Sequence, residues 1–576
     1  MPSALTYPGV YVEEIPSGVR TITGVATSIT AFIGRARRGP VNEAITINSF
    51  GDFETIFGGL WESSSLGFAV RDFFLNGGSQ AIIVRLYHAD PGNPQANPQV
   101  PKPDETYSFS IGDLNFLAAD AGKWGVGLRT SVDLDNITDD VAKALDPSLG
   151  KDDVFNLTVT DTSTGKSERF ANLSMKDSPR RVDKVLASGS SLLRYDGVPD
   201  NTKKPKAETD PLSKKEKGWA DAKKALVDKQ NADPSADVTN EKKAVADAKK
   251  ALDDEVTKAL AKVSDGLWLT VPDFLPANGE ANKQGLYALA RADLFNILCI
   301  PPYHAPADAL DIDVNLISEA AAYCEKRRAM LIVDPPKDWT TKETAKSKFN
   351  DANNDNVGTR SKNAAIYFPR VRYANPLHDN QLEDFVPCGA VAGTFARTDA
   401  QRGVWKAPAG LDATLVGVPS LSVSLTDNEN GELNPLGINC LRAFQAAGRV
   451  VWGARTLRGS DQLADEYKYV PVRRTALYIE ESLYRGLKWV VFEPNDEPLW
   501  AQIRLNVGAF MHNLFRQGAF QGTSPRDAYF VKCDKETTTQ NDIDLGIVNI
   551  LVGFAPLKPA EFVVIKLQQI AGQIEV

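Results

Sequence analysis

Two side chains stand where α/β enzymes often place catalytic groups. His304 follows the apolar run 294–300, and Asp334 follows the run 330–333, so each comes soon after a predicted buried strand. The sequence has no GxSxG motif to supply a nucleophile, and no second carboxylate lies at a spacing suited to acid–base chemistry. We therefore expect Asp334 to cap a helix or turn. An α/β enzyme using residues 266–400 stays as an alternative.

Residue spacing also argues against metal, phosphate and redox chemistry. The four histidines include no HExxH pair. Gly77 and Gly78 are accompanied by neither a GxGxxG nor a Gly-Lys-Ser/Thr motif. The five cysteines show no CxxC spacing, which favours buried thiols; they are Cys299, Cys324, Cys388, Cys440 and Cys533. We expect no metal, no cofactor and no enzymatic activity.

Length and charge restrict the kinds of partner. A chain of 576 residues is too long for one core, so two to four domains are expected. A net charge of −9 argues against nucleic acid, because phosphate binding needs a concentrated basic surface. No apolar run is long enough to span a bilayer, and the N-terminus shows no signal peptide. The sequence thus predicts cytoplasmic assembly without direct membrane insertion.

The elements that position these residues predict an α/β and α+β multidomain chain. Residues 1–20 hold one strand candidate, Val10–Ile15, between Pro8-Gly9 and Pro16. It is either an edge strand of its own domain or an arm that joins a neighbour's sheet. Residues 21–90 predict the first part of an α/β core, and residues 91–199 predict an inserted, β-sandwich-like domain.

Residues 200–265 change to an Ala/Lys-rich composition. The heptapeptide ADAKKAL occurs at 220–226 and again at 246–252. Each copy carries only a narrow apolar stripe, so the two predict a helical hairpin whose helices cover each other. A solvated excursion and a surface-binding role are both compatible with this pattern.

Residues 266–400 return to α/β signals, and 401–576 predict a C-terminal domain. Its helices are expected at about 475–485 and after the cap residues Asn495 and Asp496, with a strand at 487–492 between them. The second helix buries a broad apolar side and leaves a polar one. That polar side carries Gln502, Asn506, Asn513 and Gln517.

Several blocks resemble the contractile tail sheath family of phage tails, tailocins and extracellular contractile injection systems. The blocks are RRGP with FGDFETIFGG near the N-terminus, AGKWGVG at 121–127, VPCGAVAGTFARTDAQRGVWKAPAG at 386–410, VVWGARTL at 450–457 and KWVVFEPN with LWAQIRLNVGAFMHNLFRQGAFQG at 488–522. Many members have Asn where this chain has Gly410. The resemblance covers all three kinds of particle.

The resemblance implies a structural protein. A sheath subunit polymerises as stacked rings around an inner tube and contracts to drive the tube through a target cell envelope. The implied partners are further copies of the chain, the tube protein, and baseplate and terminal cap proteins, in a virion tail or a released particle. A static assembly protein remains the other structural alternative.

The resemblance also implies where copies would meet. Sheath subunits are linked by exchanged terminal strands, which here would involve Val10, Tyr11, Val12, Ile15, Phe562, Val564, Ile565 and Leu567. The family's C-terminal domain lies innermost, against the tube. The helix after Asp496 is therefore expected to face the tube through Arg504, Asn506, His512, Asn513 and Arg516.

Overall fold

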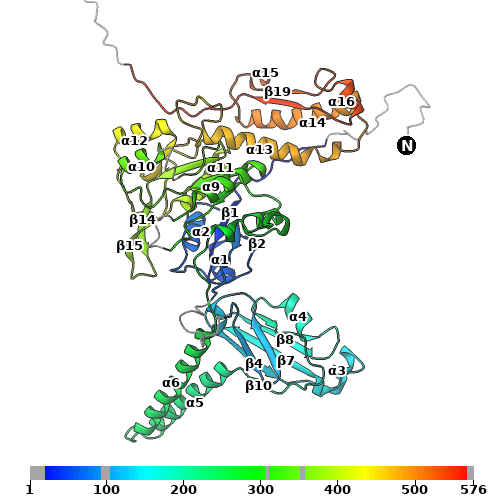
Figure 1. Ribbon diagram of the computed structural model, residues 1–576, viewed down its shortest axis with the longest axis vertical. Coiled ribbons are helices and arrows are strands. Elements are labelled where there is room, and N and C mark those ends of the chain that lie inside the picture. Colours follow the sequence, from blue (N-terminus) through cyan, green and yellow to red (C-terminus); the bar gives the residue numbers. More distant parts are fainter. Residues whose placement is uncertain (1–19, 92–103, 306–310, 351–356, 567–576) are drawn as a thin grey trace, which may run out of the picture.

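A computed structural model describes residues 20–91, 104–305, 311–350 and 357–566. Its elements form three levels along the long axis of the molecule (Figure 1). A central α/β domain lies in the middle, a layer made by the last hundred residues lies at one end, and the inserted domain lies at the other. In the described part of the chain, no helix is both long and apolar enough to cross a membrane.

The central sheet has eight strands in the order β18-β17-β13-β12-β11-β1-β3-β2. The six inner strands are parallel, and β2 and β18 are antiparallel edges. Both faces of the inner strands are buried, as parallel sheets require. The strands are β1 (Thr30–Gly34), β2 (Ala44–Ile47), β3 (Ala81–Arg85), β11 (Ile297–Cys299), β12 (Met330–Val333), β13 (Ala364–Phe368), β17 (Ile438–Phe444) and β18 (Gly448–Val451).

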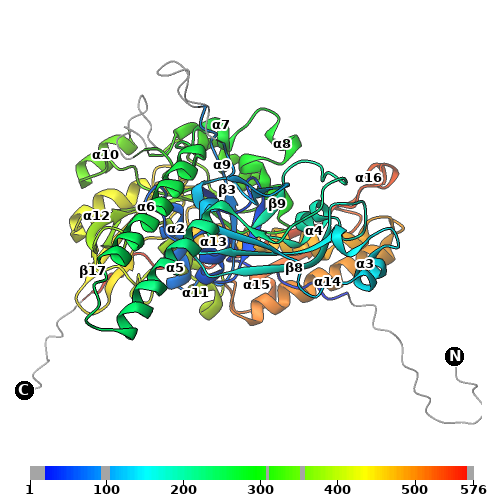
Figure 2. The same cartoon turned by 90° about the horizontal axis from the view of Figure 1, so that it is seen from below.

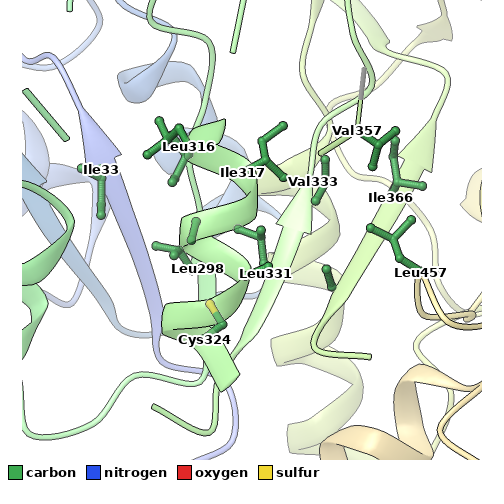
Figure 3. Close-up of a cluster of buried hydrophobic side chains, with 14 of the residues drawn as sticks. Ile33, Leu298, Leu316, Ile317, Cys324, Leu331, Val333, Val357, Ile366 and Leu457 are labelled. Carbon is green, nitrogen blue, oxygen red and sulfur yellow. The ribbon is translucent and has the colours of Figure 1, made fainter. Parts of the chain in front are cut away.

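Helices cover both faces of this sheet. On one face, α9 (Val314–Lys326) packs Leu316 and Ile317 over Leu298, Leu331 and Val333 of the strands (Figure 3). Smaller elements complete that side or the rim of the domain. They are α7 (Val271–Phe274), α8 (Gly279–Asn282), η3 (Gly285–Arg291), α10 (Lys342–Phe349), α12 (Asp427–Leu433), η4 (Asn434–Leu436), β14 (Val371–Asn375), β15 (Gln381–Phe385) and β16 (Ser420–Leu421).

The other face is covered by α1 (Phe50–Phe57), α2 (Leu66–Leu75) and α11 (Cys388–Arg402). Helices α2 and α11 approach each other very closely. A Cβ at Gly389 would lie 1.9 Å from the carbonyl oxygen of Ala69, and one at Gly393 would lie 2.4 Å from that of Phe73. Glycine is therefore required at both positions for the two backbones to meet.

The boundary expected at residue 401 lies elsewhere in the structure. Strands β17 and β18 belong to the central sheet, since β17 pairs in parallel with β13. Their apolar residues, such as Leu441 and Val451, are fully buried there. The C-terminal layer thus begins at α13 (Val470–Gly486), and residues 21–90 and 266–457 form one domain.

The inserted domain combines two antiparallel sheets with helices. The sheets have the orders β10-β6-β7-β8 and β4-β5-β9. Phe109, Phe116, Leu157 and Leu186 from both sheets and from α4 share one hydrophobic cluster. The elements are β4 (Ser108–Ile111), β5 (Leu114–Ala118), η1 (Lys123–Gly127), β6 (Leu128–Asp133), α3 (Asp139–Leu145), η2 (Lys151–Asp153), β7 (Val154–Asp161), β8 (Ser167–Ser174), α4 (Val182–Gly189), β9 (Leu193–Tyr195) and β10 (Glu208–Thr209).

The predicted hairpin is present as α5 (Pro211–Ala232) and α6 (Thr239–Lys262). It extends beside the sheets of the insertion and away from the rest of the molecule (Figures 1 and 2). Its base is more than a solvated excursion, because Leu212, Ala259 and Val263 are buried in the core of the insertion. Only the outer part of the hairpin lacks such contacts.

Three buried arginines hold the neck between the insertion and the central domain. Arg85 donates from Nε to the oxygen of Ala36, from Nη1 to that of Gly39 and from Nη2 to that of Ala121, at 2.9, 2.6 and 2.8 Å. Arg38 forms a 2.5 Å ion pair with Asp161 of β7. The third, Arg35, donates from Nη2 to the carbonyl oxygens of Asp265 and Gly266, where the chain returns from the insertion, at 3.4 and 3.1 Å. The contacts of these three arginines join the two sides of the neck.

The C-terminal layer contains α13, η5 (Lys488–Val490), α14 (Glu497–Arg516), α15 (Pro525–Ala528), β19 (Tyr529–Lys532), α16 (Gln540–Asp544) and β20 (Leu551–Phe554). Asp496 caps α14 as expected, accepting from the Leu499 N–H at 3.3 Å. The strand expected at 487–492 is instead a 3₁₀ turn. Leu487, Trp489 and Val490 pack onto the core of the layer, and Phe492 has a φ of 71°, so the segment turns instead of extending.

Candidate assembly surfaces

Asp334 caps a helix, as the sequence predicted. Its Oδ1 accepts the backbone N–H of Cys388, the first residue of α11, at 2.9 Å. Burial raises the pKa of this carboxyl to about 7. His304 packs against the ring of Tyr303. Within the described residues, no group of three or more His, Cys, Asp and Glu side chains could hold a metal.

The C-terminal segment is attached to the body through a buried ion pair. The Arg455 side chain is fully buried and donates to both Glu561 oxygens, from Nε at 2.7 Å and from Nη2 at 2.6 Å. The Tyr469 hydroxyl donates to the same carboxylate at 3.1 Å. Burial alone would raise the pKa of Glu561, but Arg455 lowers it, so the carboxylate stays charged. This pair fixes where the segment leaves the central domain.

Beyond Glu561 the chain exposes a run of apolar side chains. Phe562, Val564 and Ile565 are 75%, 77% and 78% exposed, and the described residues 562–566 belong to no helix or strand. Three of the four apolar residues expected to take part in strand exchange at this end therefore have no cover within the described chain. The fourth, Leu567, lies outside the described residues.

A small sheet lies close to this segment in the sequence. Strands β19 and β20 pair only with each other, so each has one edge that no other described strand occupies. Phe530 covers Gly553 of the partner strand, since a Cβ there would lie 2.2 Å from the Phe530 ring. Two unoccupied edges on a two-stranded sheet are places where an extended segment can add.

The first described residues, Arg20 to Ile22, contact the C-terminal layer. The backbone N–H of Arg20 donates to the Asn506 side chain at 3.1 Å, and its guanidinium lies over the ring of Trp489. Ile22 is buried in the core of the C-terminal layer. Val10, Tyr11, Val12 and Ile15, which were expected to form the exchanged arm, lie outside the described residues.

The helix expected to face the tube, α14, presents only part of the predicted polar surface. Asn506 is 1% exposed because its side chain binds the backbone of Arg20, so it does not belong to a free surface. Arg504 is 33% exposed, pairs with Glu497 at 2.6 Å and donates to the Cys533 carbonyl. The sequence pattern missed these three contacts, because Arg20 and Cys533 lie on other segments and Glu497 lies two turns before Arg504.

The remaining polar residues of α14 are exposed. Gln502, His512, Asn513, Arg516 and Gln517 lie on its solvent-facing side. The opposite side carries Leu499, Ile503, Val507, Phe510 and Leu514, all buried in the core of the layer. The expected division into a buried apolar side and an exposed polar side therefore holds for these residues of the helix, with two exceptions: Asn506 is buried and Leu505 is 54% exposed.

Sequence reasoning missed three features in this layer and at its boundary with the central domain. The ion pair of Arg455 and Glu561 joins residues 106 positions apart, which no local pattern reveals. Phe492 is wholly exposed although it follows an apolar run. A groove beside Trp405 and Trp452 is also lined by residues 557–562. The exposed Phe492 and the groove had one signal in the sequence: the blocks that carry the family resemblance contain several aromatic residues.

Two family models match the chain. The model described as "Phage tail sheath protein central domain" matches residues 277–457, and "Phage tail sheath C-terminal domain" matches residues 464–570. These ranges together make up half of the chain. Their boundary agrees with the start of the C-terminal layer at α13.

Curated relatives are also sheath proteins. The tail sheath protein of Vibrio phage KVP40 is 26% identical over 186 residues, which is 32% of this chain and 26% of that protein. A putative prophage major tail sheath protein of Pseudomonas aeruginosa is 25% identical over 291 residues, or 50% of this chain and 68% of that one. The chain thus spans about a quarter of the first relative and about two thirds of the second.

Solved structures share the fold. A sheath tail protein from Listeria innocua matches with a TM-score of 0.55 at 13% identity, covering 93% of this chain and 96% of that one. The helical sheath of the anti-feeding prophage in its contracted state matches with a TM-score of 0.51 at 21% identity, covering 98% and 100%. The matching family models, relatives and folds agree, and the chain belongs to the contractile tail sheath protein family.

Proposed function

We propose that this chain is the sheath subunit of a contractile injection machine. Copies polymerise as stacked rings around an inner tube, and contraction drives the tube through a target cell envelope. The observation that supports this is the exposed apolar run 562–565, which follows the buried Arg455–Glu561 pair. The neighbouring C-terminal layer has strand edges that no other described strand occupies. An exposed apolar run of this kind marks a surface that another molecule covers, which here is a second copy of the chain.

The links between copies are exchanged strands. A donated strand of about five residues makes several backbone hydrogen bonds, each contributing about 0.5–1.5 kcal/mol net. Links of this kind hold subunits together while the folded domains move as rigid bodies and repack. The N-terminal residues 1–19 form the second link, and they join the body at Arg20.

Deleting residues 1–19 tests these links. Arg20, Ile22 and their contacts with the C-terminal layer are retained, so the truncated subunit is expected to fold with an unchanged Tm. Electron microscopy is expected to show no sheath tubes from the truncated protein and tubes from the full chain. Normal tubes from the truncated protein would show that residues 1–19 do not link the copies. Particles of a single length would favour a static lattice over a contractile one.

The exposed side of α14 faces the inner tube. A thin polar contact suits a sheath that must hold its tube and later release it, because a large apolar interface would be costly to break. Arg516, His512 and Asn513 are exposed on this side. We assign Arg516 to a carboxylate of the tube, since Arg504 already pairs with Glu497.

Charge reversal separates the two arginines. Arg516→Glu is expected to leave the subunit's Tm unchanged and to give more contracted or tube-free sheaths. Arg504→Glu is expected to lower the Tm, because it places a second carboxylate beside Glu497 and removes a donor to Cys533. The tube contact of Arg516 also weakens with salt, since exposed pairs are screened. A particle with α14 on its outer surface would refute the assignment.

A further inference from the structure

An exposed aromatic loop stands at the start of α14. In this Phe492 loop (residues 491–496), Val491 is 63% exposed and Phe492 is 103% exposed. Phe492 has a φ of 71°, a left-handed conformation that is unfavourable for a bulky residue. A strained backbone that holds an aromatic ring entirely in solvent indicates a contact that one copy of the chain does not make.

The loop is held firmly on both sides. Before it, Trp489 and Val490 pack against the core of the layer. After it, Asp496 caps α14, and the Asn495 side chain donates to the Ile547 carbonyl at 3.0 Å. This bond brings Ile547, 42% exposed, beside the loop and extends the apolar patch. The ring is therefore presented by a rigid support.

A complementary surface lies at the other end of the same helix. This tryptophan groove, of about 680 Å³, is lined by Trp405 and Trp452 and by three cations, Arg402, Lys406 and Lys558. The one carboxylate in its described lining, Glu561, is paired with Arg455. Gln517 and Gly518, which directly follow α14, also line it. The groove offers aromatic surface and positive charge together.

The two surfaces match in chemistry and differ in position. The exposed Glu493 follows Phe492 directly in the loop, whereas the groove carries the cations. The 20 residues of α14 separate them by about 30 Å at 1.5 Å per residue. Two different surfaces at opposite ends of one element cannot pair within a chain, but they pair head to tail between copies and so build a ring or a filament.

We propose that the Phe492 loop of one copy seats in the tryptophan groove of the next copy. Phe492 packs against Trp405 and Trp452, and Glu493 faces Arg402. This inference rests on the proposed function and names a lateral contact between the C-terminal layer of one copy and the central domain and terminal segment of the next. The contact repeats around the ring and sets the spacing of neighbouring subunits.

Cysteine cross-linking tests the contact in assembled tubes. Val491→Cys combined with Lys558→Cys places one thiol on the loop and one on the groove. The five described native cysteines are all buried, so they contribute little background. Mild oxidation is expected to give a ladder of covalent multimers from the double variant and monomers from each single variant. Val491→Cys with Lys258→Cys, a position on the hairpin, is the control and is expected to stay monomeric.

Two results would overturn the inference. Dimers from Val491→Cys alone would mean that loop meets loop, and monomers from the double variant in well-formed tubes would mean that loop and groove do not meet. In both cases the tubes still form, so the proposed function stands. Failure of the full chain to form tubes would instead count against the proposed function.

Charge reversal gives a second readout. Glu493→Lys or Arg402→Glu alone is expected to slow tube assembly about tenfold, which corresponds to about 1.4 kcal/mol. The double variant is expected to return most of the rate, because the pair is restored with opposite sign. If the double variant assembles more slowly than either single variant, the two residues do not face each other.

Discussion

The inserted domain and the C-terminal layer lie at opposite ends of the long axis and treat their apolar residues differently (Figure 1). In the insertion, two sheets, α4 and the hairpin base bury most of their apolar residues in one cluster. The exposed ones, such as Val198 and Val227, are far apart in the sequence. In the C-terminal layer, Phe492 and the run from Phe562 to Ile565 are exposed. The insertion covers most of its apolar residues within one chain, whereas the C-terminal layer leaves part of its own uncovered.

The largest expected effect is a loss of assembly without a change in folding. Changing Phe562, Val564 and Ile565 together to Ser is expected to abolish sheath tubes, because the segment loses the apolar side chains that a neighbour would cover. The free energy of unfolding should change by less than about 0.5 kcal/mol, since all three are exposed. Electron microscopy and urea denaturation measure the two effects.

A matched variant sharpens this comparison. Val198→Ser combined with Val227→Ser removes two exposed apolar residues from the insertion and its hairpin. Tubes are expected to form normally. Loss of tubes from this variant, or normal tubes from the terminal one, would reverse the roles that we assign to the two regions.

The second effect is on stability and concerns the neck. Arg85→Met leaves the carbonyls of Ala36, Gly39 and Ala121 without their buried donor, so the free energy of unfolding is expected to fall by about 3–5 kcal/mol. Urea denaturation measures it. Arg169→Met, at a 55% exposed side chain, is the control and should change little. A loss below about 1 kcal/mol at Arg85 would mean that the neck is not held by this guanidinium.

A smaller effect depends on pH. Because burial raises the pKa of Asp334 to about 7, the folded chain holds a proton that the unfolded chain releases above about pH 4. The stability that Asp334 contributes is full below that pH and is lost as the pH rises through 7. Asparagine stays neutral and its oxygen still accepts from Cys388.

Asp334→Asn is therefore expected to gain stability relative to the native chain between pH 5 and pH 8, on the order of 1–3 kcal/mol. Denaturation curves at both pH values measure this difference. Burial also raises the pKa of Asp72, to about 6, but that residue is present in both proteins and cancels in the comparison. A constant difference across this range would contradict the raised pKa.

The smallest expected effect comes from the hairpin. Replacing residues 220–251 with a short Gly/Ser loop keeps Leu212, Ala259 and Val263 in the core of the insertion. Stability should change by less than about 1 kcal/mol, and tubes should form and contract. Removing residues 203–263 entirely should destabilise the insertion, because it also removes β10, which pairs with β6. Equal stability of the two deletions would mean that the hairpin base does not support the core.

Local patterns in the sequence were sufficient for much of the fold. Strands β11 and β12 of the central sheet, the hairpin and the cap of α14 by Asp496 follow from apolar runs, periodicity and capping residues. The capping role of Asp334 followed from its place after β12. These features depend on residues close in sequence, where spacing carries the information.

Features that depend on distant residues could not be predicted in this way. The pairing of β17 with β13 places the domain boundary after the position expected from the sequence. The burial of Asn506 depends on Arg20, 486 positions away. The strand expected at 487–492 does not form, because Leu487 and Trp489 pack onto the layer and the backbone turns there instead of extending. Tertiary packing decided each of these outcomes over local preference.

The pairing of β1 with β11 also governs the order in which the chain folds during synthesis. Thr30 lies opposite Ile297, so the middle of the central sheet waits until the ribosome has made almost 300 residues. The insertion is made within that interval and can fold first as a unit. Arg20 and Ile22 wait longer still, because their partners lie on α13 and α14. The layer through which we propose that copies associate is thus finished last, so the proposed contacts cannot form before most of the chain has been made.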